Sequence, residues 1–171
     1  ILADSGDNPT AGGVGSRIDV LEHVFKNKIE NTLFAGIYNE EIFRELKNKK
    51  NKIVIKDSIS KKKISISIDK FYLKNDNAIV ISNNNTVIFT KYRKPFHYLS
   101  DFRELNINLK KYKILIVKSG YLSPELKKLK ADNFMILTDG FVTQDFKRIK
   151  NLFREKPIYP FQKNFRYNIA I

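Results

Sequence analysis

The sequence of 171 residues contains no cysteine and no tryptophan, and it has only one methionine, five prolines and seven glycines. The absence of cysteine excludes a disulfide scaffold, a Cys-ligated zinc site and thiol catalysis. No stretch approaches the roughly 18 consecutive apolar residues of a membrane-spanning helix. Hydrophobic residues nevertheless make up 42% of the chain, with thirteen Phe and eight Tyr, so one domain with a sizeable buried core is expected rather than disorder.

Acidic side chains are scarce. The chain has 18 Asp and Glu against 32 Lys and Arg, which gives a net charge of +14. A polyanion partner would explain this excess, because clustered cations release counterions from phosphates. However, 25 of the 32 basic residues are Lys and only seven are Arg, whose fork suits phosphates and bases. The 22 Ile and 17 Asn that accompany them are typical of AT-rich coding. We therefore favour a solvated basic surface, densest over residues 47–63, and keep a nucleic-acid or polyanion-binding module as the alternative.

Apolar periodicity predicts eight strands and five helices. The strands are expected at residues 1–3, 33–38, 53–55, 64–73, 78–81, 86–89, 114–117 and 134–137, with a hairpin turn at Ser82-Asn83-Asn84-Asn85. The helices are expected after the capping residues Ser16, Asn39, Ser100, Ser123 and Thr143, the last helix covering residues 144–153. The order of these elements predicts an α/β fold, namely a mixed sheet with strand–helix units at both ends and an inserted antiparallel β-meander.

Four of the seven glycines fall within residues 4–15, Asp-Ser-Gly-Asp-Asn-Pro-Thr-Ala-Gly-Gly-Val-Gly, between a predicted strand and a predicted helix. Ligands of α/β proteins bind at such carboxyl ends of strands, where glycine allows a close backbone approach. The segment is neither a Walker loop nor a dinucleotide fingerprint. The candidate substrate-binding residues here are Asp4, Asp7, Asn8, Gly12 and Gly13. A structural turn and an unaided sugar or phosphate site stay open as alternatives.

A second candidate turn, Lys118-Ser119-Gly120-Tyr121, follows the predicted strand at residues 114–117. Its ammonium, hydroxyl and phenol are suited to a carboxylate or phosphate, so we include Lys118, Ser119 and Tyr121 among the substrate-binding candidates. Lys118 would supply a charge for an anionic group. The turn at residues 138–140 follows the next strand in the same way, and we interpret it as structural. With two distant histidines and no cysteine, no metal ligand is assigned within this chain.

Three segments resemble one family. Residues 3–9, Ala-Asp-Ser-Gly-Asp-Asn-Pro, followed by Gly12-Gly13, are similar to the opening of the C-terminal domain of MlrC-like proteins, the microcystinase C-type zinc metallopeptidases. Residues 113–126 resemble the family's strand and following turn, and residues 156–160 resemble its closing segment. The resemblance implies one MlrC C-terminal-like domain over residues 1–161, with residues 162–171 as a tail.

The resemblance also implies that metal binding and substrate binding are carried by different domains. In MlrC-like enzymes the zinc ligands are carried mainly by a larger domain ahead of this one, so we expect such a domain before Ile1 and no cofactor within this chain. The parent protein is then expected to be a cytoplasmic zinc-dependent hydrolase of an amide or peptide-like bond. This chain would line its cleft and be inactive alone. The expected partners are its own N-terminal metal-binding domain and a small peptide-like substrate, with neither nucleic acid nor a membrane.

Overall fold

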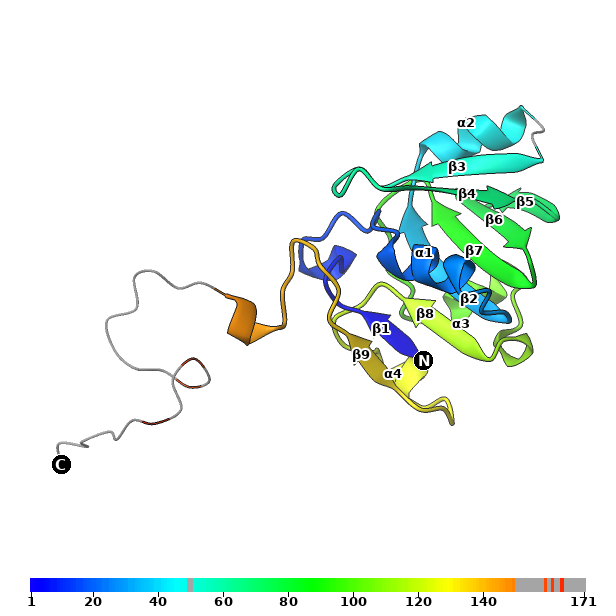
Figure 1. Ribbon diagram of the computed structural model, residues 1–171. Coiled ribbons are helices and arrows are strands. Elements are labelled where there is room, and N and C mark those ends of the chain that lie inside the picture. Colours follow the sequence, from blue (N-terminus) through cyan, green and yellow to red (C-terminus); the bar gives the residue numbers. More distant parts are fainter. Residues whose placement is uncertain (49–50, 150–158, 160, 162–163, 165–171) are drawn as a thin grey trace.

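The computed structural model describes residues 1–48, 51–149, 159, 161 and 164, and these contain nine strands and four α-helices (Figure 1). The strands are β1 Leu2–Asp4, β2 Thr32–Tyr38, β3 Lys52–Lys56, β4 Lys63–Ser67, β5 Lys70–Lys74, β6 Asn77–Ser82, β7 Asn85–Thr90, β8 Ile114–Val117 and β9 Phe134–Ile136. The helices are α1 Asp19–Lys26, α2 Glu41–Lys47, α3 Leu99–Arg103 and α4 Pro124–Lys127, with short 3-10 turns at Pro9–Ala11, Leu109–Lys111 and Phe146–Arg148.

Seven strands form one sheet in the order β5-β6-β7-β2-β8-β1-β9. The pairs β7–β2, β2–β8, β8–β1 and β1–β9 are parallel, whereas the pairs β5–β6 and β6–β7 are antiparallel and form a meander. β3 and β4 form a separate antiparallel pair. The meander and this pair are inserted between β2 and β8 in the sequence. The predicted α/β fold, a mixed sheet with an inserted antiparallel β-meander, is therefore confirmed.

The two faces of the sheet are covered by different elements, because alternate residues of each strand point to opposite sides. In β7, Val87 and Phe89 join the core under α1, α2 and the β3–β4 pair, whereas Ile88 joins the core under α3 and α4. Figure 1 shows α1 in front of the sheet and α3 behind it. Parallel strands covered in this way leave one edge, formed by their carboxyl ends, for loops and ligands.

The single strand predicted over residues 64–73 is wrong, since the chain forms two strands that belong to different sheets. β4 pairs with β3, and β5 pairs with β6. Between them the Asp69 carboxylate accepts a hydrogen bond of 2.8 Å from the backbone N–H of Asn83. Apolar and polar residues do alternate within each strand, but this pattern does not show that β4 and β5 pair with strands of different sheets.

Two of the predicted helix caps are wrong. α1 begins at Asp19, and the Ser16 hydroxyl instead lies 2.7 Å from the Ser58 hydroxyl. α3 begins at Leu99, ahead of the predicted start, and its first turn is capped by the Asp101 carboxylate. That carboxylate accepts hydrogen bonds from the backbone N–H groups of residues 97 and 98, at 3.1 and 2.9 Å. A carboxylate with two backbone donors replaces the serine hydroxyl that the sequence suggested.

The predicted caps Ser123 and Asn39 and the predicted hairpin turn are confirmed. The Ser123 hydroxyl accepts from the N–H of Leu126 at 3.3 Å, and the Asn39 side chain accepts from the N–H of Ile42 at 3.2 Å. Asn83 and Asn84 have φ angles of 48° and 59°, as the hairpin turn requires.

The predicted helix over residues 144–153 is reduced, within the residues described, to the 3-10 turn Phe146–Arg148, so Thr143 is a third wrongly predicted cap. The rest of that prediction, the closing segment 156–160 and the tail 162–171 lie wholly or mostly outside the described residues. Within residues 1–48 and 51–149, no helix has the length and apolar character needed to cross a bilayer.

Candidate functional site

Three neighbouring parallel strands place polar side chains at one edge of the sheet. β1 ends at Asp4, β8 is followed directly by Lys118, and β9 is followed by Thr138. β1 pairs with β8 on one side and with β9 on the other. The carboxyl ends of all three strands therefore meet, although Asp4 and Lys118 are 114 residues apart in the chain.

A buried ionic cluster, formed by Asp4, Asp7 and Lys118, lies at this edge. The Lys118 Nζ atom donates to Asp4 Oδ2 at 3.0 Å and to Asp7 Oδ2 at 3.3 Å. The three residues are only 4%, 0% and 5% exposed, respectively. Buried charges of this kind are tolerated only when they are paired and hydrogen-bonded. The Lys118 ammonium that the sequence analysis assigned to an anionic substrate group is thus engaged by two carboxylates.

The Asp7 carboxylate also holds the glycine loop, which is residues 4–15. Its Oδ1 atom accepts from the backbone N–H of Gly15 at 2.9 Å, and its Oδ2 atom accepts from that of Arg17 at 2.7 Å. An ionised acceptor makes such hydrogen bonds roughly twice as strong as neutral ones. Asp7 therefore ties the end of the loop to the same ammonium that binds the end of β1.

The second Asp4 oxygen connects the cluster to the segment after β9. The Thr138 hydroxyl donates to Asp4 Oδ1, and the backbone N–H of Gly6 donates to that hydroxyl oxygen at 3.2 Å. The two backbones approach so closely that a Cβ atom added at Gly140 would lie 1.8 Å from the carbonyl oxygen of Gly6. The turn at residues 138–140, which the sequence analysis interpreted as structural, thus contacts the site directly.

The middle of the glycine loop is held by its own hydrogen bonds. The Asn8 Oδ1 atom accepts from the Thr10 backbone N–H at 3.0 Å and from the Thr10 hydroxyl at 2.7 Å. The N–H of Gly13 donates to the Asn8 carbonyl at 2.8 Å. Gly13 is buried and a Cβ atom there would lie 2.6 Å from the carbonyl carbon of Asp7, whereas Gly12 is exposed with a φ of +98°. Gly12 therefore presents its backbone to the outside.

The second predicted turn packs against the first. The Ser119 hydroxyl is buried and donates to the carbonyl of Tyr121 at 2.6 Å. A Cβ atom at Gly120 would lie 3.0 Å from Asn8 Nδ2, so the two turns are in contact. The Tyr121 ring is 73% exposed. The predicted residues thus form one patch, in which Tyr121 and Gly12 face outward and the charged side chains are buried.

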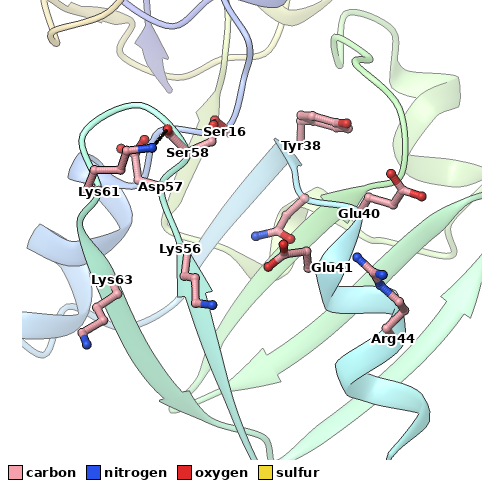
Figure 2. Close-up of a pocket in the computed structure, with 11 residues that line it drawn as sticks. Ser16, Tyr38, Glu40, Glu41, Arg44, Lys56, Asp57, Ser58, Lys61 and Lys63 are labelled. Carbon is pink, nitrogen blue, oxygen red and sulfur yellow. Dashed lines mark hydrogen bonds between the residues drawn. The ribbon is translucent and has the colours of Figure 1, made fainter.

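A pocket that was not predicted from the sequence adjoins this patch (Figure 2). We call it the α2 pocket. It has a volume of about 450 Å³ and is lined by residues 38–41 and 44, by residues 56–58, 61 and 63, and by Ser16. The N–H of Tyr38, at the end of β2, donates to the carbonyl of Gly15 at 2.8 Å. Because β2 is parallel to β8, its carboxyl end was the signal that could have located this pocket.

One wall of the α2 pocket is a turn held by the buried carboxylate of Asp57. This carboxylate accepts from the N–H groups of Ile59 and Ser60, at 2.8 and 3.0 Å, and from the Ser60 hydroxyl at 2.6 Å. Burial raises the pKa of Asp57, but these hydrogen bonds, aided by the positive charge of Arg17, outweigh it and hold that pKa below its ordinary value. Asp57 is therefore an ionised structural residue rather than a free ligand.

The donor set at this edge does not fit a zinc ion. The two carboxylates of the ionic cluster already share an ammonium, which occupies the place a cation would take. Across the part of the chain that the structure describes, no three His, Cys, Asp or Glu side chains are grouped as metal ligands require. The location of zinc in another part of the protein stays a prediction.

Comparisons with known proteins agree with this description. Nothing among the curated proteins matches the sequence. The crystal structure of a "putative metallopeptidase" from Mesorhizobium sp. BNC1 has a similar fold, with a TM-score of 0.65 and 13% sequence identity. The similarity covers 97% of this chain but 38% of the other, so this chain spans well under half the length of that protein. A sequence model of the MlrC C-terminus family matches residues 2–51 and 57–151. The resemblance found in the sequence is thereby confirmed, and this chain belongs to the MlrC C-terminus family.

Proposed function

We propose that this chain is the cleft-lining C-terminal domain of a metal-dependent hydrolase that cleaves an amide or peptide-like bond. The observation that carries the proposal is the family membership, combined with a similar protein that is more than twice as long and is named as a metallopeptidase. In this proposal, the residues that bind zinc and cleave the substrate belong to the remainder of the full-length protein, which fits the absence of grouped metal ligands among the described residues. The isolated chain is then a binding surface without catalytic activity.

The proposed surface is the edge where β1, β8 and β9 end. Its exposed parts are the phenol of Tyr121 and the backbone around Gly12, which can donate and accept hydrogen bonds with a peptide-like substrate. The buried Asp4, Asp7 and Lys118 act through the loop, since their mutual contacts hold residues 4–17 in one conformation. We assign these three as positioning residues of the glycine loop, because a loop that changes conformation would hold the substrate less often in the reactive geometry.

The test uses the full-length protein loaded with its metal and a panel of short peptides. Tyr121→Ala is expected to lower kcat/KM by about tenfold, equivalent to ~1.4 kcal/mol of lost transition-state binding, with an unchanged unfolding midpoint. The matched control is Phe134→Ala, which removes an aromatic ring of similar exposure at the amino end of β9, on the opposite edge. Equal activity of both variants would contradict the cleft-lining role. Hydrolysis by the isolated chain would contradict its proposed inactivity.

A further inference from the structure

The ammonium of the ionic cluster is not free to bind a negatively charged group of a substrate. Its ammonium is bound by two carboxylates, so a negative group on the substrate needs a cation from elsewhere. We propose that the α2 pocket binds a carboxylate of the peptide-like substrate through Arg44 and Lys56. This inference rests on the proposed function and adds a substrate class to it, namely peptides that carry a free carboxylate beside the cleft.

The pocket is continuous with the glycine loop, which places it within reach of a molecule bound there. Ser16 belongs to the wall of the pocket and follows Gly15, whose N–H is held by Asp7. The Ser16 hydroxyl lies 2.7 Å from that of Ser58 on the opposite turn, and Tyr38 donates to Gly15 on the third side. One set of hydrogen bonds thus shapes both the loop and the pocket.

Two cations face the pocket from opposite walls. Arg44 projects from α2 and Lys56 from the end of β3 (Figure 2). Neither side chain has a hydrogen bond or ion pair with any other side chain that the structure describes. Arginine is rare in this chain, with seven residues against 25 lysines, so a guanidinium here is not explained by the general excess of lysine. Its planar fork matches the two oxygens of a carboxylate.

The charges around the pocket favour an anion. Asp57, one of its three acids, already has three hydrogen-bond donors. With Glu40 and Glu41 there are three acids against four cations, since Lys61 and Lys63 also line the pocket, and the Lys61 Nζ donates to the Ser58 carbonyl at 3.2 Å. Moreover, Lys56 and Lys63 are direct cross-strand partners. Like charges placed opposite each other on a sheet are destabilising, and a bound carboxylate would relieve that repulsion.

The volume of about 450 Å³ suits one end of a small peptide rather than a large ligand. The carboxylate could come from the C-terminus of a peptide or from an acidic side chain. Both sources present the same two oxygens, so three N-acetylated probes separate them. The probes are Ala-Ala with a free C-terminus, Ala-Ala with a C-terminal amide, and Glu with a C-terminal amide.

Binding of each probe to the full-length protein is measured by calorimetry, which does not depend on turnover. The free acid, or the Glu probe, is expected to bind at least tenfold more tightly than the neutral amide. Arg44→Gln and Lys56→Gln are each expected to weaken that binding by fivefold or more. The matched controls are Lys52→Gln, at the other end of β3, and Arg103→Gln on α3, both exposed and outside the pocket. These two are expected to leave binding unchanged.

Equal binding of the acid and amide probes to the unmodified protein would overturn the proposal without any variant. So would tighter binding of a dipeptide amide with a free amino terminus, because Glu40 and Glu41 would then be the recognising groups. The proposed hydrolase function fails separately: a protein that binds the acid probes through Arg44 but cleaves no peptide would contradict that function and keep the pocket. A protein that cleaves peptides without preference for an acid would keep the hydrolase function and contradict the carboxylate-binding pocket.

Discussion

The ionic cluster at the end of β1 allows a quantitative prediction for the variant Lys118→Met, which keeps most of the length of the side chain and removes its charge. Two unit charges 3.0 Å apart attract by about 5 kcal/mol at an effective dielectric constant of ~20. The burial of the ammonium opposes this attraction. The net cost of removing one partner from a buried ion pair is typically about 3–5 kcal/mol, because it leaves uncompensated charge behind. Here that charge is two carboxylates, Asp4 and Asp7, that are both less than 5% exposed.

This cost is measurable by urea unfolding of the chain. A loss of ~4 kcal/mol at a denaturant slope of ~2 kcal/mol per molar moves the midpoint down by about 2 M. The matched control is Lys113→Met, an exposed lysine just before β8, which is expected to change stability by less than about 0.5 kcal/mol. The double variant Asp4→Asn/Lys118→Met should cost less than the sum of its single variants by at least ~1.5 kcal/mol. A cost below about 1 kcal/mol for Lys118→Met would refute the view that its ammonium neutralises the buried carboxylates.

Two further predictions concern the turns around the site. Because the pKa of Asp57 is held below its ordinary value in the fold, its ionised form stabilises the protein above the unfolded-state value of ~3.9, and that contribution is lost as the pH falls. The stability difference between wild type and Asp57→Asn, from urea unfolding between pH 7 and pH 2, should therefore shrink toward pH 2; a constant difference would argue against it. Gly140→Ala would place a Cβ atom 1.8 Å from the Gly6 carbonyl oxygen and should cost more than ~2 kcal/mol in thermal unfolding. Gly12→Ala meets no atom within 4 Å and should cost only ~1 kcal/mol of backbone strain, so equal costs would contradict the close approach at Gly140.

Much of the fold could be predicted because its signals are local. Buried apolar runs identified β2 and β8, Ser123 before a proline marked the start of α4, and the polar stretch at residues 82–85 marked a hairpin. The errors arose where the outcome depended on distant residues. Ser16 is a reasonable cap by type, but its hydroxyl lies against Ser58, 42 residues further along the chain.

In the candidate site, too, local features could be predicted and contacts between distant residues could not. Glycine clustering and position after a strand were sufficient to select Asp4, Asp7 and Lys118 as candidates from two separate turns. Their mutual pairing could not be predicted, because it depends on β1 lying between β8 and β9, a neighbour order that no local pattern encodes. The α2 pocket was missed for a related reason. Arg44 and Lys56 lie on different elements, and only the packing of α2 beside the β3–β4 pair brings them to one cavity.

The position of β1 has a consequence for how the protein is made. This strand is translated well before both of its hydrogen-bonding neighbours, which belong to residues 114–136. Contacts of such long sequence separation form slowly, and chain synthesis proceeds at about 5–20 residues per second. On the ribosome, the segment around Asp4 must therefore wait several seconds for its partners while the β5–β6–β7 meander, whose contacts are local, can already be in place. The edge of the sheet that carries the candidate site therefore cannot be assembled before β8 and β9 have been synthesised.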